Sequence, residues 1–274
     1  MEIEGKVALV TGAGAGAGRA IAARLAADGA ATVVTDIDAM GGRETAQRIE
    51  AAGGRAAFLR ADVTVEPDVR AMVAFAQETF GGLDILVNNA GGVPEPVFPD
   101  ATSDHWGRTL TLNLTGPMLA VQHALPAMAR RDGGAVVNIS SVAGLGYGPH
   151  DSPEYAAAKA GLIRLSVVLA PLAERHHVRV NCVVPNWILT ERVRAQLAAM
   201  KPQERAALPA PMTTPEEIAA AVVHFVRDDT LVGRVLVCWT GRPWHLVAAG
   251  DPGYAVDDAS VVPTPPTRGP GGTA

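Results

Sequence analysis

A tyrosine and a lysine lie four residues apart in this sequence, at Tyr155 and Lys159, and a serine precedes them at Ser141. A phenol with a pKa of about 10 is a poor base at neutral pH. Residues four apart on a helix share a face, so the ammonium of Lys159 is predicted to favour the phenolate of Tyr155 and to lower its pKa. The Ser141 hydroxyl is predicted to hold a substrate oxygen. These three groups together suit proton transfer to or from a bound substrate.

A glycine-rich turn near the N-terminus predicts the second reactant. Gly12, Gly16 and Gly18 lie between a short apolar run and an alanine-rich helical segment. Glycines at such a turn let the backbone approach a diphosphate, which then binds at the N-terminus of the helix. Asp36 ends the next predicted strand, about 20 residues beyond the turn, where a carboxylate can bind the adenosine ribose. The turn and the acid therefore predict a dinucleotide site.

The charges near this turn favour NAD over NADP. The Asp36 carboxylate repels a 2′-phosphate, and no arginine or lysine adjoins it in the sequence. Ala15 stands in the turn where a basic residue could bind that phosphate. An Asp36 that only caps a turn is compatible with the same position. We therefore expect NAD as the cofactor.

The composition excludes several other classes of protein. The 274 residues are 48% hydrophobic and 19% charged, with a net charge of −5 and scattered basic residues, which argues against a nucleic-acid surface. No apolar stretch approaches the ~20 residues of a membrane span, and no secretion signal is evident. Cys182 and Cys238 lie in apolar runs and are predicted to be buried free thiols. We expect a cytoplasmic protein with no metal, membrane or nucleic-acid partner.

Short β-branched runs alternate with longer helical segments along the chain. Strands are predicted over about residues 6–11, 31–35, 56–60, 84–87, 135–139, 179–184 and 234–237. Helices are predicted over about 18–27, 42–52, 67–80, 105–130, 153–176, 191–200 and 215–227. An irregularity is expected at the Thr-Gly-Pro stretch that begins at Thr115, and Pro171 should bend or break the helix that contains it. This rhythm predicts an α/β fold, a Rossmann-type doubly wound parallel sheet of about seven strands with helices on both faces. We expect one domain over 1–249 and a flexible Pro/Gly-rich tail over 250–274.

Several motifs in this order resemble those of the short-chain dehydrogenase/reductase family, in its compact single-domain form, over about residues 6–237. The glycine turn matches TGxxxGxG, and Tyr155 and Lys159 match YxxxK. The resemblance implies that Tyr155 is the general acid/base, that Lys159 lowers its pKa and holds the nicotinamide ribose, that Ser141 orients the substrate and that Asn113 supports a water-mediated proton relay. It also implies cofactor contacts from Gly12, Gly16, Ala17, Gly18, Asp36, Asp62, Val63, Asn89, Ala90, Gly91, Tyr155, Lys159, Pro185 and Thr190.

The region expected to bind substrate departs from the family pattern. Asn186 follows Pro185 where the family commonly has glycine, and asparagine tolerates a left-handed backbone. Trp187 then either lines the pocket as a lid or forms a hydrophobic plug, and His150 either reaches the pocket or stays solvated. A mainly apolar pocket and a lipophilic or cyclic substrate are expected, with contacts from Gly92, Val93, Pro94, Leu145, Tyr147 and Trp187.

Three functions remain open from the sequence. The first is an NAD-dependent oxidoreductase that interconverts a secondary alcohol and a ketone. The second is a 3-oxoacyl-thioester reductase of the fatty-acid type, which would favour NADP and is disfavoured by Asp36. The third is a non-catalytic dinucleotide-binding protein, which would be expected to lose Tyr155 or Lys159. The resemblance also implies a homo-oligomer, a dimer or a tetramer, paired through the two long predicted helices.

Overall fold

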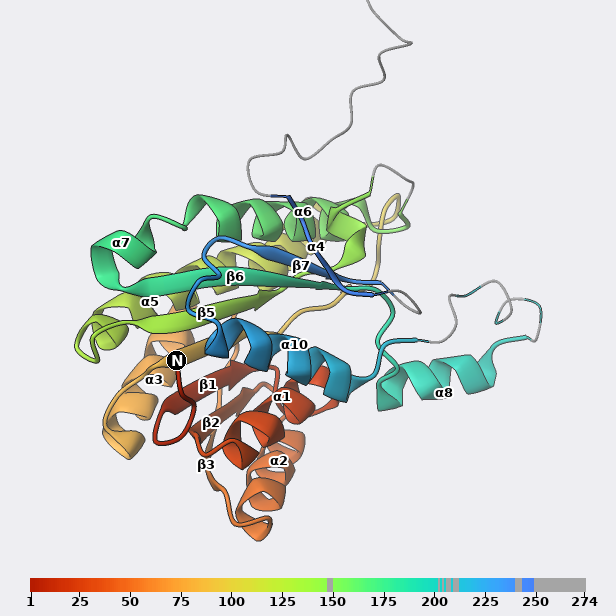
Figure 1. Cartoon of the computed structure of the whole chain (residues 1–274). Coiled ribbons are helices and arrows are strands. Elements are labelled where there is room, and N and C mark those ends of the chain that lie inside the picture. Colours follow the sequence, from red (N-terminus) through yellow and green to blue (C-terminus); the bar gives the residue numbers. More distant parts are fainter. Residues whose placement is uncertain are drawn as a thin grey trace, which may run out of the picture.

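The protein is described by a computed structural model over residues 1–146, 150–201, 203, 205, 208, 212–239 and 243–248. Strands of the described chain form one sheet in the order β3-β2-β1-β4-β5-β6-β7-β8 (Figure 1). Strands β1 to β7 run parallel, as predicted, and β8 pairs antiparallel with β7. The strands are β1 (Val7–Thr11), β2 (Ala31–Asp36), β3 (Arg55–Arg60), β4 (Ile85–Asn88), β5 (Gly134–Ile139), β6 (Val178–Pro185), β7 (Val235–Cys238) and β8 (His245–Leu246).

Helices cover both faces of this sheet, which confirms the predicted Rossmann-type fold. One face carries α1 (Gly16–Ala27), α2 (Ala39–Ala51) and α10 (Pro215–Arg227). The other carries α3 (Glu66–Phe80), α4 (Ser103–Leu110), α5 (Gly116–Ala129) and α6 (Pro153–Val168). Two further helices are α7 (Leu172–His176) and α8 (Glu191–Ala199), and α8 projects beyond the sheet (Figure 1).

Both long helices expected from the sequence are interrupted. The one over 105–130 divides into α4, a π-helical turn over Thr111–Thr115 and α5. At this turn the N–H of Gly116 bonds to the carbonyl of Thr111, five residues back. The helix over 153–176 ends at Val168 and resumes as α7 after Pro171, whose missing N–H accounts for the predicted break.

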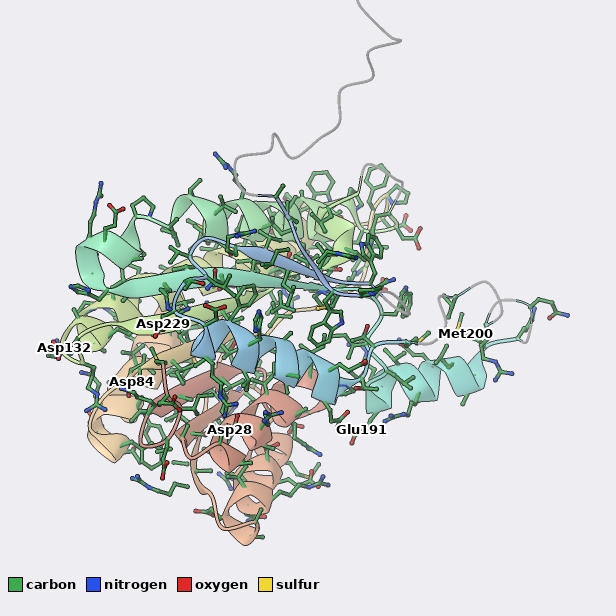
Figure 2. All side chains as sticks on the ribbon, in the orientation of Figure 1. Asp28, Asp84, Asp132, Glu191, Met200 and Asp229 are labelled. Carbon is green, nitrogen blue, oxygen red and sulfur yellow. The ribbon has the colours of Figure 1, made fainter. Side chains whose placement is uncertain are left out.

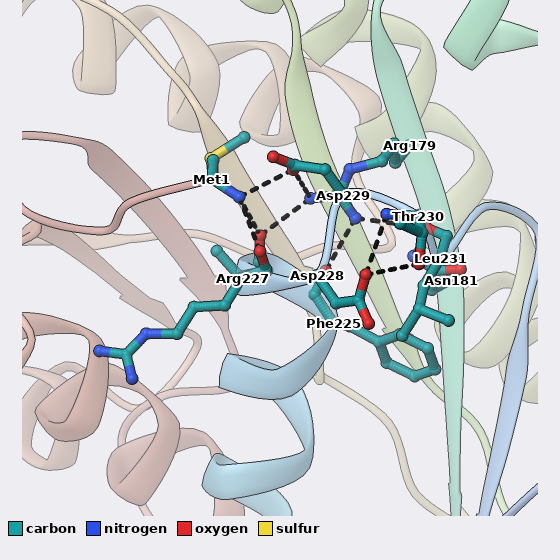
Figure 3. A network of polar contacts seen from close by, with 10 residues as sticks. Met1, Arg179, Asn181, Phe225, Arg227, Asp228, Asp229, Thr230 and Leu231 are labelled. Atoms are coloured by element: carbon teal, nitrogen blue, oxygen red, sulfur yellow. Dashed lines mark hydrogen bonds and ion pairs between the residues drawn. The ribbon is translucent and has the colours of Figure 1, made fainter.

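A buried arginine anchors α10 to the sheet. Arg179, on β6, donates hydrogen bonds to the carbonyls of Phe225 and Val226, both at 2.8 Å, and pairs with Asp229 at 3.0 Å (Figure 3). Asn181 donates to the Leu231 carbonyl at 2.8 Å. These contacts satisfy carbonyls at the end of a helix that would otherwise be unpaired. They therefore fix the connection between α10 and β7.

The parallel strands bring their carboxyl ends to one edge of the sheet. Thr11 of β1 lies beside Thr35, and Asn88 of β4 lies beside Asn138 of β5. The strand order reverses between β1 and β4, and ligands of open α/β sheets bind in the crevice beyond such a point. The predicted division at residue 249 stays a prediction, because residues 249–274 lie outside the described chain. Within the described part, no helix is both long and apolar enough to cross a bilayer.

Candidate active site

A cleft of about 1070 Å³ opens at this edge of the sheet. That volume exceeds the ~300–1,000 Å³ of common small-molecule sites, so a dinucleotide and a small substrate can share it. Most of the residues that the sequence singles out line this cleft. They are Gly12, Gly16, Ala17, Gly18, Asp36, Asp62, Val63, Asn89, Ala90, Gly91, Gly92, Val93, Pro94, Ser141, Tyr155, Lys159, Pro185, Trp187 and Thr190.

Helix α6 presents Tyr155 and Lys159 to the cleft. Ser152 caps the start of this helix by accepting a hydrogen bond from the Tyr155 N–H at 3.4 Å. The Lys159 ammonium lies 5.6 Å from the centroid of the Tyr155 ring. It donates to the carbonyl of Ile139 at 2.9 Å, and the Ser140 hydroxyl donates to the Lys159 carbonyl at 2.8 Å. Strand β5 and helix α6 are thereby joined twice beside the reacting groups.

The pKa of Tyr155 corrects one expectation. Burial of the phenol raises its pKa above the ordinary value of 10.0, and a hydrogen bond with the Ser141 hydroxyl opposes that rise. The predicted lowering by Lys159 is not found, because its ammonium lies over the ring face and donates to a backbone carbonyl instead of to the phenol oxygen. At neutral pH Tyr155 is therefore a protonated donor in this structure.

The buried ammonium of Lys159 is itself perturbed. Its side chain is 3% exposed, and burial lowers its pKa from 10.5 to about 8. Cys182 lies close enough to Lys159 to interact with it electrostatically, and burial raises the pKa of the Cys182 thiol to about 12. Cys182 and Cys238 are buried free thiols, as predicted. Lys159 and Cys182 are therefore both largely shielded from water.

Asn113 and Leu145 do not line the cleft. The π-helical turn leaves the Thr109 carbonyl free to accept from the Asn113 side chain at 2.9 Å. The same amide donates to the Gly92 carbonyl at 2.8 Å and accepts from the Gly92 N–H at 3.0 Å. Asn113 therefore holds the segment after β4 in place. Leu145 packs instead against the apolar residues of β6 and β7.

The predicted loop residues take different positions at the mouth of the cleft. Trp187 lines it and is 42% exposed, which favours the lid over the plug. His150 also lines it, with its ring stacked 5.7 Å from the ring of Tyr155. Asn186 does not adopt the left-handed backbone that the substitution for glycine allowed for. Tyr147 lies outside the described residues.

The glycine turn fits a diphosphate. Helix α1 begins after Ala15 with no side-chain cap and no acid in its first turn, so its N–H groups are not neutralised. Gly18 brings the turn into close contact, since a Cβ added there would lie 2.1 Å from the Gly12 carbonyl oxygen. A Cβ added at Gly16 would lie 3.0 Å from Thr190, at the start of α8. The turn therefore leaves room for an anion and for little else.

Asp36 and a basic residue, Arg19, both bond to the backbone of Gly14. Asp36 accepts hydrogen bonds from the N–H groups of Gly14 and Asp38, at 2.7 and 2.9 Å. The guanidinium of Arg19 donates to the carbonyl of the same Gly14. Arg19 is paired with Glu44 at 3.0 Å, a contact between residues far apart in sequence. No local pattern could have indicated it.

The cleft also contains polar residues that no motif singled out. Arg108 on α4 and Arg192 and Gln196 on α8 line it. The residue spacing gives one signal, since Arg192 and Gln196 lie four apart on a predicted helix. Among the residues that the structure describes, no cluster of three or more His, Cys, Asp or Glu side chains could hold a metal ion.

Comparison with known proteins places this site in context. Residues 6–201 match the family described as short chain dehydrogenase. The chain is 39% identical to cis-4-hydroxycyclohexanecarboxylate dehydrogenase of Sinomonas cyclohexanicum, over 84% of this chain and 94% of the relative. It is 34% identical to cyclohexanol dehydrogenase of Acinetobacter sp. strain SE19, over 82% and 88%. It is 35% identical to D-beta-hydroxybutyrate dehydrogenase of Cupriavidus necator, over 74% and 78%.

A solved structure shares the same architecture. 7 alpha-hydroxysteroid dehydrogenase, complexed with NADH and 7-oxo glycochenodeoxycholic acid, superposes with a TM-score of 0.80 at 31% identity, over 88% of this chain and 95% of that one. The family match and these relatives support an oxidoreductase that acts on alcohols and ketones. With the glycine turn and the Tyr155–Lys159 pair facing one cleft, the chain belongs to the short-chain dehydrogenase/reductase family.

Proposed function

We propose that this protein is an NAD-dependent dehydrogenase that interconverts a secondary alcohol and a ketone on a lipophilic or cyclic small molecule. The observation that carries this is the convergence of Ser141, Tyr155 and Lys159 on the cleft that the glycine turn also lines. Relatives named for cyclohexanol and for a hydroxycyclohexanecarboxylate support the cyclic substrate class. A cytoplasmic homo-oligomer is part of the proposal, with the faces of α4, α5 and α6 as the pairing surface, and light scattering measures its size.

Asp36 supports the preference for NAD. Its carboxylate lies in the cleft, held by the Gly14 N–H, where it can accept hydrogen bonds from a ribose diol and repels a 2′-phosphate. Arg19 is the basic residue beside this position, and Glu44 and Glu191 both pair with it. Its charge is therefore engaged within the protein. The NADP-dependent thioester reductase remains the less favoured alternative, and a non-catalytic protein is disfavoured because Tyr155 and Lys159 are both in place.

The chain's own groups account for the proton in this reaction. The nicotinamide, when bound, supplies or accepts the hydride. In ketone reduction the protonated Tyr155 phenol donates its proton to the substrate oxygen, and in alcohol oxidation the phenolate accepts it. Ser141 holds the same oxygen by a hydrogen bond. The Lys159 ammonium places a positive charge 5.6 Å from the centroid of the Tyr155 ring, although it does not lower the pKa of the phenol in this structure.

The Tyr155→Phe variant tests this function. Phenylalanine keeps the aromatic ring and its contact with His150 but has no proton to transfer. We expect kcat/KM for a cyclic ketone to fall by at least about 100-fold, while the Kd of NADH, measured by fluorescence, changes by less than about threefold. Turnover equal to that of the unaltered enzyme would show that Tyr155 is not the acid/base.

A further inference from the structure

We propose that Arg192 binds an anionic group of the substrate, so that the preferred substrates are cyclic hydroxy or oxo acids carrying a carboxylate. This inference rests on the proposed function and narrows its substrate class. Arg192 lies in the first turn of α8 and lines the cleft together with Gln196, one helical turn further on. Residues four apart share a helix face. Arg192 and Gln196 therefore both border the cleft from α8.

The guanidinium of Arg192 has no partner within the described chain. It makes no hydrogen bond or ion pair with any residue that the structure describes, whereas the acids along the cleft are engaged. Glu191 lies 4.0 Å from Arg19, and Asp62 accepts hydrogen bonds from Thr64 at 2.7 and 2.8 Å. Arg108 on α4 also lines the cleft without a side-chain partner among the described residues, so two unpaired arginines border the cleft in a protein whose net charge is −5. Such charges attract anionic ligands.

Two anions could meet this guanidinium, the diphosphate of the cofactor and a carboxylate of the substrate. The diphosphate already has donors, because the glycine turn and the uncapped N-terminus of α1 face it. Apolar lining is supplied by Trp187 and Ile188, which precede α8, and by Val93 and Pro94 after β4, while Asn186, Thr190 and Glu191 add polar groups near the helix. An unpaired arginine in a cleft that also has apolar lining matches a substrate with an apolar body and one carboxylate, which a guanidinium binds through two parallel hydrogen bonds.

The neighbouring Arg194 provides a matched control. It lies on the same helix, two residues from Arg192, and lines a separate groove formed by α1, α2 and α10. Arg192→Ala and Arg194→Ala remove the same charge from the same element. If overall charge or helix stability is responsible, both variants should change in kcat/KM. If substrate binding is responsible, only Arg192→Ala should change.

The experiment compares 4-oxocyclohexanecarboxylate with its methyl ester, which has nearly the same shape and no charge. The unaltered enzyme should favour the carboxylate in kcat/KM by about 10-fold or more at low salt, with the preference falling as salt is added. Arg192→Ala should abolish this preference by raising KM for the carboxylate at nearly unchanged kcat. Arg194→Ala should keep it.

Other outcomes overturn the proposal in distinguishable ways. If Arg192→Ala weakens NADH binding and leaves the carboxylate-to-ester ratio unchanged, the guanidinium binds the cofactor diphosphate instead. If the unaltered enzyme prefers the ester, no carboxylate is recognised. If neither ketone is turned over, the proposed function fails; binding of the two probes to the NADH-loaded Tyr155→Phe variant, measured by calorimetry, then tests Arg192 separately. Equal affinity for both probes in that measurement rejects the carboxylate site.

Discussion

Replacing Lys159 by methionine should stabilise the protein in the absence of cofactor while removing its activity. Lys159 is 3% exposed, and burial lowers the pKa of its ammonium from 10.5 to about 8. The folded protein therefore binds this proton more weakly than the unfolded chain does. At about 1.4 kcal/mol for each tenfold change in proton affinity, burying the charged form costs about 3 kcal/mol at pH 7.

Removing this charge should raise the free energy of unfolding of Lys159→Met by about 3 kcal/mol at pH 7, but part of that gain is offset. Methionine fills a similar volume but cannot donate to the Ile139 carbonyl, and an unpaired buried carbonyl costs about 1 kcal/mol. The net gain at pH 7 is then about 2 kcal/mol. The lysine penalty is largest below its folded pKa and shrinks as the pH rises toward 10.5. By pH 10 it amounts to about 1 kcal/mol, so the variant should lose its advantage there.

Urea unfolding at fixed protein concentration, followed by tryptophan fluorescence at pH 7 and pH 10, measures the difference. Lys6→Met serves as the control, since the Lys6 side chain is 34% exposed and lies 3.9 Å from Asp84. Its removal should give no gain at pH 7. A Lys159→Met variant that unfolds at the same urea concentration as the parent at pH 7, or whose gain is equal at both pH values, refutes the reasoning.

Two further variants test the turn and the anchor of α10. Gly18→Ala places a Cβ 2.1 Å from the Gly12 carbonyl oxygen, and we expect NADH binding to weaken by at least about 10-fold with helical content retained. Gly107→Ala, which meets no atom within 4 Å, should leave that affinity unchanged, and equal losses in both would reject the turn as the reason. Arg179→Met leaves the Phe225 and Val226 carbonyls without their donor. It should cost about 3 kcal/mol of unfolding free energy in urea, and a loss below about 1 kcal/mol would show that water replaces the guanidinium.

The sequence predicted the fold because its signals are periodic and local. Buried β-branched runs, glycine stops and helical segments of ten or more residues determine the βα alternation, and Pro171 marked a real break. The Thr-Gly-Pro stretch at Thr115 indicated an irregularity in this helix, but not the π-helical geometry of Thr111–Thr115, in which Asn113 bonds to Gly92 far away in the sequence. The two-residue strand β8 is too short to show a period.

In the candidate site, likewise, the sequence indicated the residues involved but not their contacts with residues distant in the chain. A spacing of four places Tyr155 and Lys159 on one face, but it does not say where a long flexible side chain ends. The Lys159 ammonium donates to the Ile139 carbonyl on β5, and the pKa of the Tyr155 phenol is raised instead of lowered. Arg19 and Glu44 likewise meet only through the fold. Motifs indicated which residues face the cleft, and burial determined their protonation.

The double connection between β5 and α6 has a consequence for engineering. The Lys159 ammonium and the Ser140 hydroxyl tie together the two elements that carry Ser141 and Tyr155, so the proton-handling groups form one rigid unit. Helix α8 and the segment after β4 attach at other points of the sheet. Helix α8 can therefore be exchanged for its counterpart from a related enzyme, altering which molecules are accepted while the hydrogen bonds between β5 and α6 stay intact.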